Sequence, residues 1–136
     1  MTLLIDANII LDVLQGRLPH LKDSSLVWKM CETKIHNGVI SALTIPNIVY
    51  VMRKELTPEQ TESILNKLLL IFDVADLTIE DLSKAASLRW NDYEDAIQSV
   101  IAERISADYI ITRNTADYSD SIVPVLTPEE FITKHS

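Results

Sequence analysis

The sequence is short of cysteine, glycine and positive charge, and each shortage excludes a class of protein. The one cysteine, Cys31, cannot form a disulfide within the chain, which indicates a reducing compartment. Only 2 Gly and 5 Pro among 136 residues leave little room for flexible linkers. Because Cys31 has helical spacing to Val27 and Ile35, we predict that the Cys31 side chain packs in the core.

Long apolar segments are also missing from the sequence. No segment approaches the roughly 20 consecutive apolar residues that cross a membrane as a helix. The apolar run that ends at Asp6 is too short for a signal peptide. We therefore expect a cytoplasmic protein without a membrane partner.

The charge balance is acidic, with 12 Lys and Arg against 20 Asp and Glu and a net charge of −8. The strongly basic surface that is typical of nucleic-acid-binding proteins is therefore absent. Any contact with RNA must depend on local lysines and arginines, on bound metal or on a partner protein. With 47% hydrophobic and 24% charged residues, the chain is predicted to fold as one globular domain over residues 1–136.

Short apolar runs alternate with helical patterns, which predicts an α/β domain with a mostly parallel sheet. The predicted strands cover residues 3–5, 39–40, 72–74, 108–112 and 123–126. Helices are predicted to begin near Ile9, Asp23 or Ser24, Pro46, Pro58, Thr78, Asp92 and Pro128. Asn37 and Gly38 are predicted to end the helix that begins near Asp23.

Asp6 is the first candidate site residue, because a carboxylate at the end of a buried strand is costly unless it is paired or bound to metal. Ligands of parallel sheets bind beyond the carboxyl ends of the strands, where Asp6 lies. Alternatively, Asp6 caps the helix that begins near Ile9. Asn8 is a second candidate for that cap, which would free Asp6 for a ligand.

A second acidic cluster opens the helix after residue 92. Asp92, Asp95 and Ser99 share one helical face, and Asp95 borders the apolar stripe. Glu94 is predicted to point elsewhere, into solvent. Acidic residues in a first helical turn also complement the helix dipole, so this cluster alone does not define a site.

A third cluster, Thr112, Asn114 and Asp117, follows the clearest predicted strand. Such residues are either turn formers or ligands. If the strands that end at Asp6 and Thr112 are neighbours, Asp6, Asp95 and Asp117 converge on one pocket. Like charges about 4 Å apart repel by roughly 4 kcal/mol at an effective dielectric constant near 20, and a divalent cation removes that repulsion.

The ligand types in this pocket favour a hard cation. Carboxylate and amide oxygens suit Mg²⁺ or Mn²⁺, which lower the pKa of bound water for attack on phosphodiesters. The histidines are scattered and form no zinc-binding group with Cys31. They are His20, His36 and His135.

Taken together, these motifs resemble the PIN-domain family, particularly bacterial PIN proteins of the VapC-like toxin type. The similarity is carried by residues 4–12 (LIDANIILD), 92–98 (DYEDAIQ) and 109–118 (YIITRNTADY). Residues 41–50 match the family's second-strand-to-helix segment, and residues 125–131 resemble its usual ending. The similarity covers essentially the whole chain.

The resemblance implies a three-layer domain with a mostly parallel five-stranded sheet flanked by helices. It also implies a homodimer, Mg²⁺-dependent (or Mn²⁺-dependent) endoribonuclease activity and an antitoxin partner that blocks the pocket. The family's acids fall on Asp6, Asp95 and Asp117, which would hold the metal. Thr112 and Asn114 would lie beside it.

The sequence departs from the family pattern at two positions near this pocket. Asn47 stands where the family usually has a glutamate, and Ala7 stands where a hydroxyl residue often follows the first acid. Asp12 and Glu94 are additional acids, of which Asp12 is expected to face a neighbouring helix. Two functions follow: a ribonuclease, or a catalytically weakened module that keeps the pocket, with Asn47 in it, as a docking site.

Overall fold

The central strand of the fold is β1 (Thr2–Ile5) in a five-stranded sheet with the order β3-β2-β1-β4-β5. The computed structural model describes residues 1–135. All four strand pairs are parallel. The expectation of an α/β fold with a parallel five-stranded sheet is confirmed. The remaining strands are β2 (Asn37–Ser41), β3 (Asp73–Ala75), β4 (Tyr109–Ile111) and β5 (Val125–Leu126).

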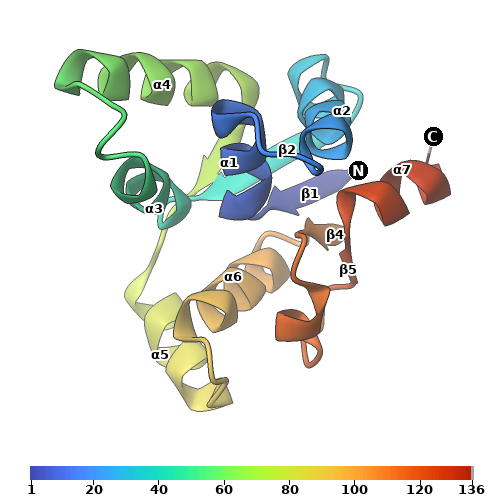
Figure 1. The fold of residues 1–136 in the computed structure, drawn as a ribbon. Helices are drawn as coiled ribbons and strands as arrows, with labels where there is room; N and C mark the ends of the chain where they lie inside the picture. The colour runs from blue at the N-terminus through green and yellow to red at the C-terminus, as the bar shows by residue number, and fades with distance from the viewer. Residues whose placement is uncertain (136) are drawn as a thin grey trace.

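Helices cover both faces of the sheet and give the predicted three layers. In Figure 1, α5 and α6 lie on one side of the sheet, and α1, α2 and α4 lie on the other. No helix between residues 1 and 135 is long and apolar enough to cross a membrane. The helices are α1 (Ala7–Gln15), α2 (Leu21–Glu32), α3 (Thr44–Val51), α4 (Pro58–Ile71), α5 (Ile79–Leu88), α6 (Tyr93–Arg104) and α7 (Pro128–His135), with a 3₁₀ turn η1 (Thr115–Tyr118).

The short apolar run of β1 separates two hydrophobic cores. Leu3 and Ile5 belong to one core, and Leu4 belongs to the other, because successive strand side chains point to opposite faces. All three are essentially inaccessible to solvent. A strand buried on both faces must be apolar throughout, which is why Asp6 marks the point where β1 leaves the core.

Three helix starts agree with the sequence. Thr57 caps α4 and Thr78 caps α5, each with a reciprocal hydrogen bond from the third residue of the helix. Asp92 caps α6 through the amide of Asp95. By contrast, α3 begins at Thr44, two residues before Pro46, where its start was predicted.

The predicted limits of α2 are wrong at both ends. The helix begins at Leu21, so Asp23 and Ser24 lie inside it rather than capping it. Ser24 is fully buried, because its hydroxyl serves a buried acid on α1. The Ser24 hydroxyl thus bonds to a residue of another helix instead of capping its own. The preference of serine for helix caps does not reveal such a contact.

The segment Asn37–Gly38 does not end α2 but begins β2. Gly38 is required by close packing, since a Cβ atom there would lie 2.6 Å from the Sγ atom of Cys31. Cys31 is buried as predicted, Val27 is buried too, and Ile35 is 67% exposed in the turn after α2. The prediction that the helix extends to Ile35 is therefore wrong.

A buried acid joins the two helices on the α5–α6 side of the sheet. Asp81 is 2% exposed and accepts hydrogen bonds from Arg104 at 3.0 and 2.9 Å. Burial alone would raise the pKa of Asp81, but hydrogen bonds from Arg104 and Thr78 and the charge of Arg104 outweigh it and lower that pKa. The pair therefore stabilises the fold while Asp81 is ionised.

We predict that Asp81→Asn lowers the free energy of unfolding by about 2 kcal/mol at pH 7, the usual contribution of a hydrogen bond to a charged group. Because the folded pKa is lowered, this difference is present above the unfolded value of about 3.9 and disappears as the pH falls through the folded pKa. Urea unfolding from pH 7 to pH 3 measures it. Glu80→Gln on the same helix is the control, since Glu80 is exposed. A difference that does not depend on pH would contradict the prediction.

Candidate metal centre

Asp6 lies at the carboxyl end of β1, where the backbone passes into α1. Its amide donates to the carbonyl of Ile111 at 3.0 Å, which confirms that β1 and β4 are neighbours. Its Oδ1 accepts from the amide of Ala7 at 2.7 Å, so Asp6 is itself the N-cap of α1. The alternative cap, Asn8, is wrong. One carboxylate oxygen of Asp6 is thus fixed by the helix.

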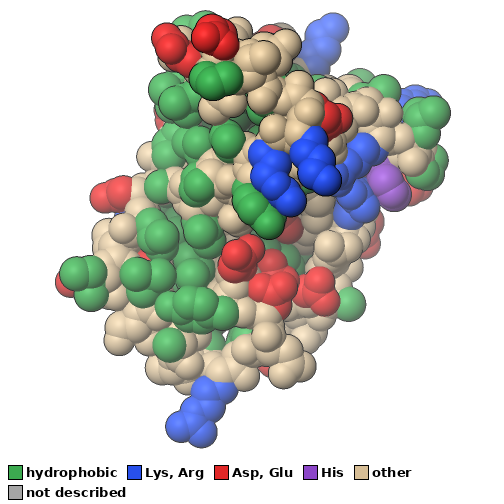
Figure 2. Space-filling model, turned by 60° about the vertical axis from the view of Figure 1, so that its left-hand side comes forward, with side chains coloured by type: hydrophobic (Ala, Val, Ile, Leu, Met, Phe, Trp, Pro, Cys, Tyr) green, Lys and Arg blue, Asp and Glu red, His purple; other side chains and the backbone are tan. Residues whose placement is uncertain are grey.

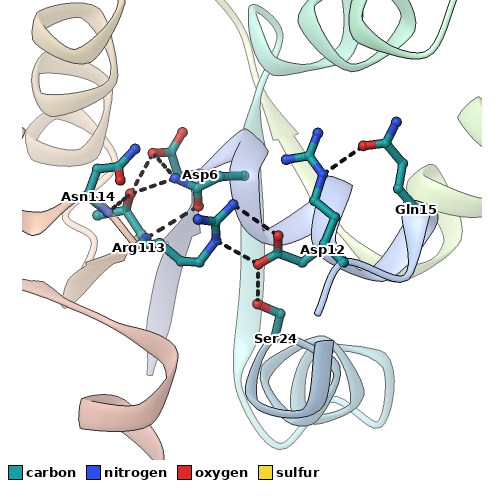
Figure 3. Close-up of polar contacts among 9 residues, drawn as sticks. Asp6, Asp12, Gln15, Ser24, Arg113 and Asn114 are labelled. Carbon is teal, nitrogen blue, oxygen red and sulfur yellow. Dashed lines mark hydrogen bonds and ion pairs between the residues drawn. The ribbon is translucent and has the colours of Figure 1, made fainter. Parts of the chain in front are cut away.

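The second oxygen of Asp6 is held by the loop after β4. Thr112 donates its hydroxyl to Asp6 Oδ2 at 2.7 Å. The side-chain amide of Asn8 and the backbone amide of Asn114 both donate to the Thr112 hydroxyl, each at 3.1 Å. Figure 3 shows Asn114 and Asp6 side by side at this point. Thr112 is therefore a buried group that orients Asp6, and Asn114 lies beside Asp6, the first of the predicted metal ligands.

Asp95 is joined to Asp6 by a tyrosine, Tyr118, which no sequence motif marks as a site residue. The hydroxyl of Tyr118 lies 3.0 Å from Asp95 Oδ1 and 3.4 Å from Asp6 Oδ2. Tyr118 is 2% exposed, and its ring packs edge-on against Trp90. Its position directly after Asp117 was the available signal, but an aromatic residue there equally suggests core packing.

Burial and like charge control the protonation of these acids. Burial raises the pKa of Asp6, and the hydrogen bonds from Thr112, Ala7 and Tyr118 oppose that rise. Burial, followed by the charge of Asp92, raises the pKa of Asp95 to about 7. The charges of Asp6 and Asp117 add to this rise. The ionised acids therefore repel one another, and a bound cation would relieve this repulsion.

The acids open onto a cleft of about 410 Å³. Figure 2 shows acidic side chains gathered on one face of the molecule, with apolar side chains beside them and basic side chains above. Asp117 lines the cleft from η1, and Asp6 and Asp95 line it from β1 and α6. The three predicted metal ligands are thus brought to one place. The cleft is lined by Asp6, Ala7, Asn8, Leu11, Asn47, Tyr50, Val51, Asp92, Glu94, Asp95, Asn114 and Asp117.

Asn47 and Glu94 face each other across this cleft. Asn47 lies on α3 and donates its side-chain amide to Glu94 Oε2 at 3.2 Å. Glu94 is exposed, but it lines the cleft instead of pointing away from it. The prediction that Glu94 points elsewhere is therefore wrong, because the contact with Asn47 comes from a helix 47 residues away along the chain.

The oxygen donors and the negative charge of these side chains suit a divalent cation. The side chains are not already arranged around a metal position. Within residues 1–135, no three His, Cys, Asp or Glu side chains already form a metal-holding group. Mg²⁺ usually keeps several waters and binds through one or two carboxylates, so it needs no such cage. Gln98, 5% exposed, carries an Oε1 atom that is the one buried side-chain polar atom without a partner in residues 1–135. Gln98 also lies close enough to lower the pKa of Asp6 through its side-chain nitrogen, but Gln98 does not line the cleft, so this oxygen is not assigned to the cation.

A buried ion pair supports the loop that carries Thr112 and Asn114. Asp12 is fully buried and accepts from Arg113 at 2.9 and 3.1 Å and from Ser24 at 2.8 Å. Figure 3 shows this group beside Asp6, with Ser24 contributed by α2. Asp12 therefore faces a neighbouring helix as expected, and it also anchors the loop after β4.

The chain belongs to the PIN-domain family, whose model matches residues 2–116. No curated protein sequence matches the chain.

Solved structures share this fold. A toxin–antitoxin complex from Klebsiella pneumoniae contains a chain with 24% identity and a TM-score of 0.71, over 92% of this chain and 96% of that one. VapBC2 from Rickettsia felis, bound to a DNA fragment from its promoter, gives 15% identity and a TM-score of 0.71 over 93% and 98%. The sarcin-ricin loop cleaving toxin VapC20 of Mycobacterium tuberculosis has 10% sequence identity and a TM-score of 0.65, over 79% of this chain and 86% of that one.

We predict that Asp12→Ala lowers the free energy of unfolding by about 3 kcal/mol, because it leaves Arg113 without its buried partner. Ser24→Ala is the matched control and is expected to cost about 1 kcal/mol, since it removes one hydrogen bond and leaves the ion pair intact. Urea unfolding measures both variants. Equal losses for the two variants would show that the ion pair adds nothing beyond the hydroxyl contact.

Proposed function

We propose that this PIN domain is an Mg²⁺- or Mn²⁺-dependent endoribonuclease and the toxin of a toxin–antitoxin pair. The observation that carries the proposal is the meeting of Asp6, Asp95 and Asp117 in one cleft at the carboxyl ends of β1 and β4. Membership in the PIN-domain family supports it. So does the similarity in fold to VapC20, a toxin that cleaves the sarcin-ricin loop.

Six polar side chains in or beside the cleft have a role in this proposal. Asp6, Asp95 and Asp117 hold the cation, and Asn47 and Asn114 supply neutral contacts. Thr112 keeps the Asp6 carboxylate turned into the cleft through its 2.7 Å hydrogen bond. The bound cation would supply the Lewis acidity by which water attacks an RNA phosphodiester.

Protein partners form part of the same proposal. Two residues on α3 at the edge of the cleft, Tyr50 and Val51, are 65% and 45% exposed. Exposed apolar side chains beside a functional cleft are typical of a protein-binding surface, and an antitoxin that covers the cleft would bury them. We also propose a homodimer, which light scattering on the purified protein tests.

A second function is favoured by one feature of the cleft. No three metal-ligating side chains within residues 1–135 are already assembled, and Asn47 brings an amide rather than a charge. A regulatory module that keeps the cleft as a docking site would have these properties. Metal binding separates the two functions.

We predict that the natural protein binds Mn²⁺ and Mg²⁺ and that Asp95→Asn abolishes binding, because the Tyr118 hydroxyl links the half-buried Asp95 carboxylate to that of Asp6. Calorimetry measures both. Asp73→Asn is the control, since Asp73 is exposed and begins β3, at the amino ends of the parallel strands, whereas the cleft lies at the carboxyl ends. In Mn²⁺ the natural protein, alone or freed from a partner, is expected to cleave an RNA pool that Asp95→Asn leaves intact. Absence of metal binding at millimolar concentration would favour the regulatory module.

A further inference from the structure

We infer that Glu94 is a fourth acidic ligand of the cation site and that Asn47 is its positioning residue. This inference rests on the proposed function, since it assigns a further ligand to the same cation. The geometry that carries it is the hydrogen bond from the Asn47 side chain to Glu94 Oε2, at 3.2 Å, across the mouth of the cleft.

The direction of this hydrogen bond fixes how Glu94 is presented. An ionised carboxylate only accepts hydrogen bonds, so the nitrogen of the Asn47 amide must face Glu94. Oε2 is therefore turned toward α3. Among residues 1–135, neither a second hydrogen bond nor an ion pair is made by the Glu94 carboxylate. Its other oxygen is thus free for a ligand in the cleft.

The surroundings of Glu94 differ from those of an ordinary glutamate in a first helical turn. Glu94 follows Tyr93 at the start of α6, and the next residue, Asp95, is one of the three acids of the site. A solvated glutamate would gain most by pointing away from these like charges. Asn47 instead holds it on the cleft side, where only a cation offsets the repulsion.

Because Asn47 on α3 faces Glu94 on α6, the acid could stand on either of these two helices. Asn47 provides a donor, and Glu94 on the opposite wall provides the charge that a carboxylate on α3 would otherwise bring. If residue 47 became glutamate, two carboxylates would face each other about where the hydrogen bond now lies. Only one of the two walls can therefore carry this negative charge. The double substitution Asn47→Glu/Glu94→Gln would move it from α6 to α3.

The experiment is Mn²⁺ binding by calorimetry on six proteins. They are the natural chain, Glu94→Gln, Asn47→Ala, the exchange variant Asn47→Glu/Glu94→Gln, Asp95→Asn and Glu80→Gln. Glu80 is the matched control because it is also exposed and is also the second residue of its helix, α5. Thermal unfolding of each variant checks that the fold is kept.

We expect Glu94→Gln to weaken Mn²⁺ binding about tenfold or more, and Asn47→Ala to weaken it by a smaller factor, as loss of an orienting partner does. The exchange variant is expected to recover most of the affinity, and Glu80→Gln is expected to bind like the natural chain. Recovery by exchange is the result that a purely structural contact between α3 and α6 would not give.

Three results would overturn the inference in distinguishable ways. If Glu94→Gln binds Mn²⁺ as tightly as Glu80→Gln while Asp95→Asn loses binding, Glu94 is only a contact between helices and the cation site stands without it. If the natural chain binds no Mn²⁺, both the inference and the proposed nuclease fail together. A lower melting temperature with unchanged affinity in Asn47→Ala and Glu94→Gln also assigns the pair a purely structural role.

Discussion

The pairing of β1 with β4 is the constraint on which the candidate site depends. Ile5 lies opposite Ile111, and the amide of Asp6 extends the pairing by one further hydrogen bond, to the carbonyl of Ile111. This register sets Thr112 beside Asp6, so that its hydroxyl reaches the carboxylate. A slip of one residue would turn Thr112 to the other face of the sheet and remove that contact.

The protein treats its buried acids in two different ways. Asp12 and Asp81 each receive two hydrogen bonds from an arginine, Arg113 and Arg104 respectively. Asp6 and the neighbouring acid of α6 receive theirs from hydroxyl and amide groups, and within residues 1–135 neither forms an ion pair. Neutral donors orient a carboxylate without cancelling its charge. The acids that support the fold are thus neutralised internally, whereas the cleft keeps its negative charge for a ligand.

The parallel sheet and the identity of the acids could be predicted because they follow from local patterns. Buried strands in a parallel sheet are continuous apolar runs, so the acid that ends β1 was recognisable in the sequence. The helix starts at Thr57 and Thr78 were also local signals, since both use a hydroxyl and the residue three positions later. The convergence of Asp6, Asp95 and Asp117 required only that two strands be neighbours.

Contacts between distant segments could not be predicted in the same way. Tyr118 has an apolar ring that suits the core and a hydroxyl whose use depends on two acids from other elements. The orientation of Glu94 depends on a donor on α3, and the Ser24 hydroxyl bonds to a buried acid on α1 instead of capping α2. Sequence spacing within one helix carries no information about such partners, so the predictions for Glu94 and Ser24 were wrong.

The two walls of the cleft differ in how firmly they are held. On one wall, the loop between Thr112 and Asn114 is anchored to α1 and α2 through Arg113 and the fully buried Asp12. On the other, α3 meets α6 through a buried hydrogen bond from Gln98 to Thr44, at the start of α3, and through an exposed one from Asn47 to Glu94, with which water competes. Any widening of the entrance therefore falls to the part of α3 beyond Thr44, while the loop between Thr112 and Asn114 keeps its place. The width of a ligand that the cleft admits thus depends on one end of one short helix.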